Sequence, residues 1–450
     1  MSDRILADLD PNRLPDDRFA PVLYHIGDAS TPLKRWRQWL QGIAPRGWPD
    51  VRSHAKHVMD LIADGKVLFT AAMALRADGP KAPGPNFLPL EGLDQSELWK
   101  MCSVLSQSIH SDTYRPGPER VVWLKKTSGR GRRPIVIGNV QDRVIAKAAA
   151  LVLRPMLDMR FDPLSFAFRA TRTREQALSL AGLLADSHPI WLPHDLKDAF
   201  GRVPLDRLLD VVQNWLPCPR LRTFLRRILP PQSRELSGLK QGSPLSPLML
   251  ELYLTHVLHE PWRKDNQPSI LLRYADDILV VSQDRKQAIS ADGALRKRLT
   301  PSGMLLKQSY EDTVVDIREQ SADWLGFSLR QAGKKFTIRL ASNAFLKLSR
   351  RFLLAHAKCR SAERAQQVLR HWFDQLGPCY RWVDRDAIIR EGLKTANAYG
   401  FEELPEAFEL KQRWGESKSR WRSTQRRVRN EPGYLVPGRL APPTPTSVIV

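Results

Sequence analysis

The stretch Leu271-Leu272-Arg273-Tyr274-Ala275-Asp276-Asp277-Ile278-Leu279-Val280-Val281 places two adjacent carboxylates between two apolar runs. Both runs are short and rich in residues that favour strands, so the stretch predicts a β-hairpin with Asp276 and Asp277 at its tip. Paired Asp side chains can hold a divalent metal ion. Taken alone, however, a solvated turn is the simpler interpretation of one Asp-Asp pair.

A third carboxylate, Asp195, stands near the end of a short, largely apolar strand predicted at 190–196. A site that transfers a phosphoryl group with two Mg²⁺ ions about 4 Å apart needs acidic groups from separate strands. One Asp at a strand end and a hairpin-borne pair can supply those groups. By itself, Asp195 is more simply a turn or capping residue.

Between these carboxylates the sequence reads Gly238-Leu239-Lys240-Gln241-Gly242-Ser243-Pro244-Leu245-Ser246-Pro247. Gly242 permits close approach of another backbone. Ser246 and Pro247 suit the N-cap and the first position of a helix. The stretch therefore predicts a stiff loop that enters a helix, and an ordinary loop–helix junction remains an alternative to a functional segment.

A basic hairpin is predicted upstream, with strands at 121–124 and 134–137 and a loop at 128–131. It gathers five cations within nine positions: Lys125, Lys126, Arg130, Arg132 and Arg133. Guanidinium groups suit bidentate phosphate binding, which makes this hairpin a candidate phosphate-binding element. For Lys126, Arg130 and Arg132, a solvated position is an equal alternative.

The remaining pattern predicts helices at 93–110, 141–159, 174–186, 205–229, 246–258 and 342–399. Helices, strands and hairpins alternate without a repeated βαβ rhythm, which favours the α+β class. Residues 1–95 form an N-terminal extension with a Pro/Gly-rich loop at 79–89. The last twenty residues are Pro-rich and are predicted to be disordered.

Composition narrows the partners. The 450 residues include 70 Lys+Arg against 48 Asp+Glu, a net charge of +22, which favours a nucleic acid over an anionic membrane. No run of about 18 apolar residues predicts a membrane span, and the start of the sequence argues against a secretory signal, so we expect a cytoplasmic protein. Cys102, Cys218, Cys359 and Cys379 form no C-x-x-C pair and are expected to be reduced thiols.

Taken in order, the motifs resemble those of reverse transcriptases, specifically the bacterial group II intron-like lineage. The resemblance covers about 110–330 and rests on eight segments: Tyr114-Arg115-Pro116, Arg133-Pro134-Ile135, Asp142-Arg143-Val144, Ser165-Phe166-Ala167-Phe168-Arg169, Asp195-Leu196-Lys197-Asp198-Ala199-Phe200, the Gln241–Pro247 segment, Tyr274–Asp277 and Trp324-Leu325-Gly326-Phe327. It implies a right-hand polymerase of α+β class. Fingers and palm, with an antiparallel sheet plus helices, would cover 96–335. A helical thumb or maturase-like domain would cover 336–410, and a basic segment with a Pro-rich tail 411–450.

Residue by residue, the resemblance implies that Asp195, Asp276 and Asp277 are the catalytic metal-binding carboxylates, with the Leu196 carbonyl as an extra oxygen ligand. Two Mg²⁺ ions, or Mn²⁺, would be the cofactors. Nucleotide-binding roles are implied for Lys125, Arg133, Phe200, Gln241 and Gly242, with Phe200 as an aromatic gate against a ribose 2′-OH. Primer or template roles are implied for Arg169, Tyr274, Ala275, Trp324, Leu325, Gly326 and Phe327. A structural ion pair is an equal alternative for Arg169.

The sequence departs from the family at two places. Ala167 stands where the family usually has Gly. Where the family carries a Lys whose proposed role is to protonate pyrophosphate, an ungapped comparison places Tyr310 and Glu311, with Lys307 nearby as a substitute. The general acid is therefore left open. Basic residues interleaved with Trp414 and Trp421 at 411–430 could clamp phosphates with stacking aromatics, or form a solvated basic helix.

An RNA-templated RNA polymerase shares the three-Asp arrangement but usually has a second Asp where this chain has Phe200. A maturase that only binds intron RNA is a non-enzymatic alternative, although the intact Asp set favours polymerisation. The expected partners are an RNA template, dNTPs and the cDNA product. For the cellular role we expect a domesticated enzyme that copies a cognate non-coding RNA in antiviral defence. A group II intron protein without an endonuclease domain, acting in splicing and retrohoming, is the alternative.

Overall fold

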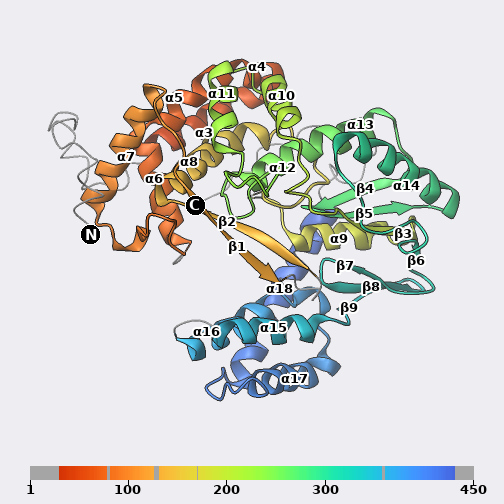
Figure 1. The fold of residues 1–450 in the computed structure, drawn as a ribbon. Coiled ribbons are helices and arrows are strands. Elements are labelled where there is room, and N and C mark those ends of the chain that lie inside the picture. The colour runs from red at the N-terminus through yellow and green to blue at the C-terminus, as the bar shows by residue number, and fades with distance from the viewer. Residues whose placement is uncertain (1–29, 79–81, 126–130, 170, 357–359, 431–450) are drawn as a thin grey trace.

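The computed structural model describes residues 30–78, 82–125, 131–169, 171–356 and 360–430. Helices surround three separate antiparallel sheets, which confirms the predicted α+β class. Figure 1 shows the N-terminal helices at one end, the largest sheet at the other, and the C-terminal helices on a third side. Among the described residues, no helix is long and apolar enough to cross a membrane.

The N-terminal helices pack around one long central helix, α8 (Val140–Leu157), most of whose apolar side chains are buried. Asp94 begins α7 with a capping box, in which its side chain accepts from the Glu97 N–H while the Glu97 side chain accepts from the Asp94 N–H. The helices of this group are α3 (Thr31–Ile43), α4 (Trp48–Ser53), α5 (Val58–Ala63), α6 (Gly65–Ala77) and α7 (Gln95–His110).

A two-stranded hairpin leaves this helical group. Strand β1 (Glu119–Lys125) pairs with β2 (Arg132–Gly138), so the predicted strands are confirmed and each is longer than expected. The hairpin extends towards the C-terminal helices (Figure 1). Residues 126–130, which include Lys126, Arg130 and most of the predicted loop, lie outside the described residues.

The central sheet has four antiparallel strands in the order β4-β5-β3-β6. Its strands are β3 (Ile190–Asp195), β4 (Ile270–Tyr274), β5 (Asp277–Ser282) and β6 (Val315–Asp316). Alternate residues of β5 enter two different cores: Ile278 and Val280 pack with the N-terminal helices, and Leu279 and Val281 with the C-terminal helices. Burial on both faces explains why these strands are almost continuously apolar in sequence.

Helices cover both faces of this sheet. Helix α9 (Arg174–Leu184) lies on the side of the C-terminal core, and α12 and α14 lie on the other side. The predicted helix at 205–229 is divided at Leu216–Cys218, because Pro219 begins a new helix. The helices of this region are α10 (Leu205–Trp215), α11 (Pro219–Ile228), α12 (Ser246–Leu254), a π-helical turn at Thr255–His259, α13 (Glu260–Lys264) and α14 (Arg285–Leu299).

A third sheet, of strands β7 (Ala322–Trp324), β8 (Phe327–Ala332) and β9 (Lys335–Leu340), leads into the C-terminal helices. Strand β9 crosses the domain boundary expected at 335/336. The helices that follow are α15 (Ala344–His356), α16 (Ser361–Asp374), α17 (Arg385–Asn397) and α18 (Ala407–Asn430). Short 3₁₀ turns occur at Ala44–Arg46, His54–His57, Leu90–Gly92, Thr300–Ser302, Gly377–Cys379 and Trp382–Asp384.

The segment 411–430 is helical as expected, but its tryptophans do not stack outward. Trp414 is 0% exposed and Trp421 is 7% exposed. Helix α18 packs against α16 and against α9, a helix that covers the central sheet. The interpretation of these rings as a nucleic-acid clamp is wrong, because they fill the C-terminal core. Cys102, Cys218 and Cys379 are buried free thiols, and Cys359 lies outside the described residues.

Candidate active site at the end of the central sheet

The three aspartates singled out in the sequence meet at one end of the central sheet. Asp195, the last residue of β3, is the cross-strand partner of Asp277, the first residue of β5. Tyr274 pairs with Asp277 across a two-residue turn, so Asp276 projects from the same strand end. The Leu196 N–H donates to the Asp276 carbonyl at 3.0 Å, which ties β3 directly to this turn. The sheet register therefore assembles residues that lie 81 positions apart.

The turn itself has an unfavourable backbone conformation. Ala275 has a φ of +59°, and Asp276 is not among the described residues with positive φ. In a two-residue hairpin turn, a positive φ is a conformation that glycine adopts more easily than alanine. For an alanine, the left-handed conformation costs about 1–2 kcal/mol, so surrounding contacts must hold it.

The carboxylates repel one another in a partly buried site. Burial, followed by the charges of Asp276 and Asp195, raises the pKa of Asp277 to about 7. Burial and the Asp195 charge raise the pKa of Asp276 as well. Burial and mutual repulsion thus disfavour the ionised forms of these carboxyl groups. A bound cation would stabilise the ionised forms.

Lys307 provides the nearest counter-charge. Its ammonium group forms an ion pair with Asp195 Oδ2, and its backbone N–H donates to the Asp195 carbonyl at 2.9 Å. Of the residues considered for the general acid, Lys307 is thus the one held against a catalytic candidate. Tyr310 instead packs partly against the core that includes the N-terminal helices, and burial raises its pKa.

The donor set fits a hard divalent cation. The other oxygen of Asp195, Oδ1, is buried and has no hydrogen-bond partner, and Asp276 and Asp277 add further carboxylate oxygens at the same strand end. Within the described ranges, no three acidic, His or Cys side chains already converge as a ligand set. Lys307 pairs with Asp195 Oδ2, so Oδ1 is the oxygen of Asp195 that is left for a cation in this structure.

The Gln241–Gly242 segment lies against the β1–β2 hairpin. The Val136 N–H of β2 donates to the Gln241 carbonyl at 2.7 Å. Gly242 has a φ of +110°, and a Cβ at this position would lie 2.7 Å from the Val136 carbonyl oxygen. Next to it, Lys240 forms a largely buried ion pair with Glu119 at 2.7 Å. The predicted nucleotide segment is therefore fastened to the basic hairpin.

The hairpin carries two of the residues predicted to bind the nucleotide, and it holds them on different faces. Arg133 pairs with Leu124, and Lys125 pairs with Arg132, so Arg133 and Lys125 lie on opposite faces of the ladder. Burial raises the pKa of Asp276, and the Arg133 charge is among those that oppose this rise, so it lies within electrostatic range of the carboxyl group. Strand pleating turns Lys125 to the other face, and its contact with the triphosphate stays a prediction.

Phe200 follows the Asp195 strand through a tight turn in which Asp198 has a φ of +50°. Its carbonyl accepts from the Leu239 N–H at 2.8 Å, which joins it to the loop that carries Gln241. The ring is half-buried and packs against the core that includes the N-terminal helices. The predicted gate residue is thus next to the predicted nucleotide segment.

Burial counts against three of the predicted primer or template contacts. Arg169 is 8% exposed, and its guanidinium donates to the carbonyls of Asp158, Asp162 and Ser165, which favours the structural alternative. In the β7–β8 hairpin, Trp324 and Phe327 are also buried, because they belong to the C-terminal core. Leu325 and Gly326 form the turn between them, with φ of +51° and +83°, and both are at least partly exposed.

Sequence reasoning missed three buried polar residues below the Asp276 turn: Arg273, Glu251 and His259. Each stands in a run that is otherwise mainly apolar, and that was the available signal. A charged residue predicted to be fully buried requires a partner, because burying an unpaired charge is very costly.

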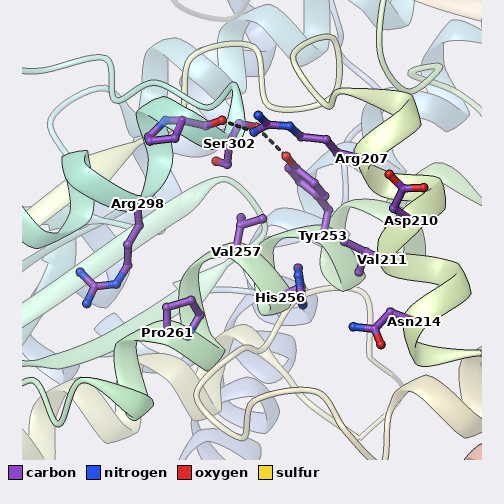
Figure 2. Close-up of a pocket in the computed structure, with 11 residues that line it drawn as sticks. Arg207, Asp210, Val211, Asn214, Tyr253, His256, Val257, Pro261, Arg298 and Ser302 are labelled. Atoms are coloured by element: carbon purple, nitrogen blue, oxygen red, sulfur yellow. Dashed lines mark hydrogen bonds between the residues drawn. The ribbon is translucent and has the colours of Figure 1, made fainter.

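A cavity of about 620 Å³ lies away from the aspartates, between α10, the π turn and the end of α14 (Figure 2). Its cations already have partners: Arg207 donates to the Pro301 carbonyl, and Arg298 pairs with Asp265. Tyr253 donates to the Ser302 carbonyl at 2.6 Å. None of the predicted site residues lines this cavity, so it is not the candidate active site.

A family model and several known proteins are similar to parts of this chain. The family model described as reverse transcriptase (RNA-dependent DNA polymerase) matches residues 124–329. An uncharacterised 91 kDa protein in the cob intron of Schizosaccharomyces pombe is 28% identical over 161 residues, which are 34% of this chain and 20% of that protein. Protein YkfC of Escherichia coli is 24% identical over 54% of this chain and 77% of its own length.

The group II intron-encoded protein LtrA of Lactococcus lactis is 24% identical over 36% of this chain and 28% of its own length. The match thus spans about a fifth of the S. pombe protein and just over a quarter of LtrA. All three predicted catalytic aspartates fall inside the residues matched by the family model.

Proposed function

We propose that this chain, whose residues 124–329 form a reverse transcriptase domain, is an RNA-directed DNA polymerase. The observation that carries the proposal is the register of the central sheet, in which Asp195 and Asp277 are direct cross-strand partners beside Asp276. Carboxylates from two strands at one sheet end are what two-metal nucleotidyl transfer requires.

In this proposal Asp195, Asp276 and Asp277 hold two Mg²⁺ ions, and the Leu196 carbonyl is a further oxygen donor. Mn²⁺ suits the same oxygen ligands. When bound, the ions would lower the pKa of a primer 3′-hydroxyl and neutralise the charge that develops on the triphosphate. Lys307 neutralises Asp195 in their absence, and we propose that it is released towards the reacting phosphates when the site fills.

The nucleotide would enter between the Gln241–Gly242 segment and the hairpin face that carries Arg133. The guanidinium of Arg133 can bind triphosphate oxygens in a bidentate manner. Gly242 brings its backbone close to β2 without a side chain between them. Phe200, joined to the same loop through Leu239, would exclude a ribose 2′-hydroxyl and so favour dNTPs over NTPs.

An RNA template and a DNA product are proposed from the family match and the net charge of +22. An RNA-synthesising polymerase is disfavoured, because Phe200 stands where such enzymes usually carry an acidic residue that binds the 2′-hydroxyl. The Leu325–Gly326 turn would contact the primer backbone, and Tyr274 and Ala275 would lie under its terminus.

The test is primer extension with a primed RNA template, dNTPs and Mg²⁺. The wild-type chain should extend the primer, and Asp276→Ala should lose all measurable extension, a drop of at least about 10³-fold. Asp206→Asn is the matched control, because the Asp206 side chain is 89% exposed on α10. Extension retained in Asp276→Ala would reject the site.

For the cellular role, we propose reverse transcription of a cognate structured RNA in antiviral defence. The similarity to a group II intron-encoded protein favours a second candidate, an intron protein that acts in splicing and retrohoming. Sequencing of RNA and DNA that co-purify with the chain from its native cells separates the two. Intron RNA would select the second role, and a separate non-coding RNA with its cDNA the first.

A further inference from the structure

A completely buried polar network lies directly under the Ala275–Asp276 turn. Arg273, on β4, is 0% exposed, and its partner Glu251, on α12, is 1% exposed. The guanidinium makes a two-pronged ion pair, with Nη1 to Glu251 Oε2 at 3.0 Å and Nη2 to Glu251 Oε1 at 2.8 Å. Ser165 Oγ donates to the same carboxylate at 2.5 Å, which fixes its orientation.

A rare helical turn completes the network. Glu251, Thr255 and His259 recur every four residues along α12 and the π-helical turn that follows it. His259 Nε2 accepts a hydrogen bond from Arg273 Nε at 3.0 Å. Burial and the Arg273 charge hold the pKa of His259 well below its ordinary value, so the ring is neutral and can accept this bond. Single π turns are frequent at functional sites.

The network ends on the catalytic turn. Arg273 Nη1 also donates to the Ala275 carbonyl at 3.2 Å, and the next carbonyl, of Asp276, accepts from the Leu196 N–H at 3.0 Å. Both carbonyls of the strained turn therefore accept a hydrogen bond, that of Ala275 from Arg273 on β4 and that of Asp276 from Leu196, which follows β3. These two bonds offset the cost of the left-handed conformation at Ala275.

We propose that Arg273, oriented by Glu251 and His259, is a positioning residue that sets the geometry of Asp276 and Asp277 for metal binding. This inference rests on the proposed polymerase function. A buried ion pair is weak as a source of stability, because desolvation of both charges offsets most of their attraction. An apolar pair of similar size in place of Arg273 and Glu251 could fill the same space, but it could not donate the hydrogen bond to the Ala275 carbonyl.

The first test is Arg273→Lys, which keeps the charge and loses the fork that spans Glu251, His259 and Ala275. We expect kcat for single-nucleotide addition to fall about 100-fold, as for a misplacement of catalytic groups by about 1 Å. The KM for dNTP should stay within about twofold, and the Mg²⁺ concentration for half-maximal rate should rise. Arg370→Lys is the control, because Arg370 makes a comparable two-pronged ion pair with Glu409 between α16 and α18.

A second test leaves the ion pair intact. His259→Gln keeps an acceptor for Arg273 Nε and should retain near wild-type kcat, whereas His259→Leu removes it and should lose about tenfold, equivalent to one hydrogen bond to a charged group. If Arg273→Lys does not fold, this pair decides the question. Equal kcat and equal Mg²⁺ dependence in the two folded His259 variants would overturn the inference.

A readout without catalysis separates this inference from the polymerase proposal. Mg²⁺ should raise the melting temperature of the wild-type chain, Asp276→Ala should abolish that rise, and Arg273→Lys or His259→Leu should reduce it. If wild type does not extend a primer but the variants still follow this order, the polymerase proposal fails and the positioning role stands. If wild type is active and the variants bind Mg²⁺ and turn over like wild type, only the positioning role fails.

Discussion

At the level of single residues, the groups around Asp277 set its pKa, and the groups around Phe200 set its position. Asp277 is surrounded by like charges, and burial together with Asp276 and Asp195 raises its pKa to about 7. Phe200 is held by the bond between its own carbonyl and the Leu239 N–H. The chemistry of both can be changed by one substitution without disturbing a whole element.

The raised pKa of Asp277 predicts a pH-dependent stability. An unfolded Asp titrates near its ordinary value of about 3.9. Between about pH 4 and pH 7 the folded metal-free chain therefore binds more protons than the unfolded chain, so the contribution of this carboxyl to stability falls as pH rises through that window. In EDTA, thermal unfolding between about pH 5 and pH 8 should show a larger fall for wild type than for Asp277→Asn. Parallel curves would contradict the prediction.

Mg²⁺ reverses this dependence, because the cation and the proton compete for the same oxygens. The rise in melting temperature on adding Mg²⁺ should therefore be larger at about pH 8 than at about pH 6. Asp206→Asn should behave like wild type in both experiments, since its side chain is 89% exposed.

Phe200→Ala should admit ribonucleotides. Removal of the ring opens space where a 2′-hydroxyl would lie, and the preference for dNTP over NTP, measured as a ratio of kcat/KM values, should fall at least about tenfold. Phe408→Ala is the control, because Phe408 is 73% exposed on α18. An unchanged ratio would reject Phe200 as the gate.

At the scale of elements, the β1–β2 hairpin and the Gln241 loop behave as one unit. The Val136 N–H bond to the Gln241 carbonyl and the Lys240–Glu119 ion pair join them at two points. Pleating puts Arg133 and Lys125 on opposite faces of the hairpin, and the Arg133 charge acts on Asp276. The proposed nucleotide site thus depends on the spacing between two elements as well as on its side chains.

Gly242→Ala should disturb that spacing. Its added methyl group would lie 2.7 Å from the Val136 carbonyl oxygen, a separation that requires the backbone to move. We expect kcat/KM for dNTP to fall at least about tenfold, mainly through KM, in steady-state primer extension. Gly400→Ala controls for the backbone cost alone, because Gly400 also has a positive φ, of +75°, and nothing within 4 Å of the added atom. Equal effects of the two substitutions would contradict the role of this contact.

At the scale of the whole molecule, α18 connects the C-terminal helices to the central sheet. It packs against α16 and α9, and the Trp414 indole N–H donates to the Leu376 carbonyl at 2.8 Å. Arg174 of α9 donates to the Gln375 carbonyl at 2.9 Å, close to the same point. The last described helix therefore fixes how the C-terminal helices meet the sheet that carries the aspartates.

Trp414→Ala should cost about 3–5 kcal/mol in the free energy of unfolding, because a fully buried ring and its hydrogen bond are both lost. Trp382→Ala should change stability by less than about 0.5 kcal/mol, since Trp382 is 69% exposed. Urea unfolding of both variants measures the difference. A small effect of Trp414→Ala would show that α18 is not part of the core.

The sequence alone predicted the strands beside Asp195 and Asp276, the hairpin tip and the order of the family motifs, whereas the N-cap predicted at Ser246 was wrong, because α12 already begins at that residue. These depend on local alternation and on turn residues, which a linear chain displays directly. The tertiary structure decided which cations face the site, that Arg169 and Trp414 are buried, and that Arg273 reaches Glu251 and Ala275. Burial and pairing arise between segments far apart in sequence, so a charged or aromatic residue shows its role only when the opposing surface is known.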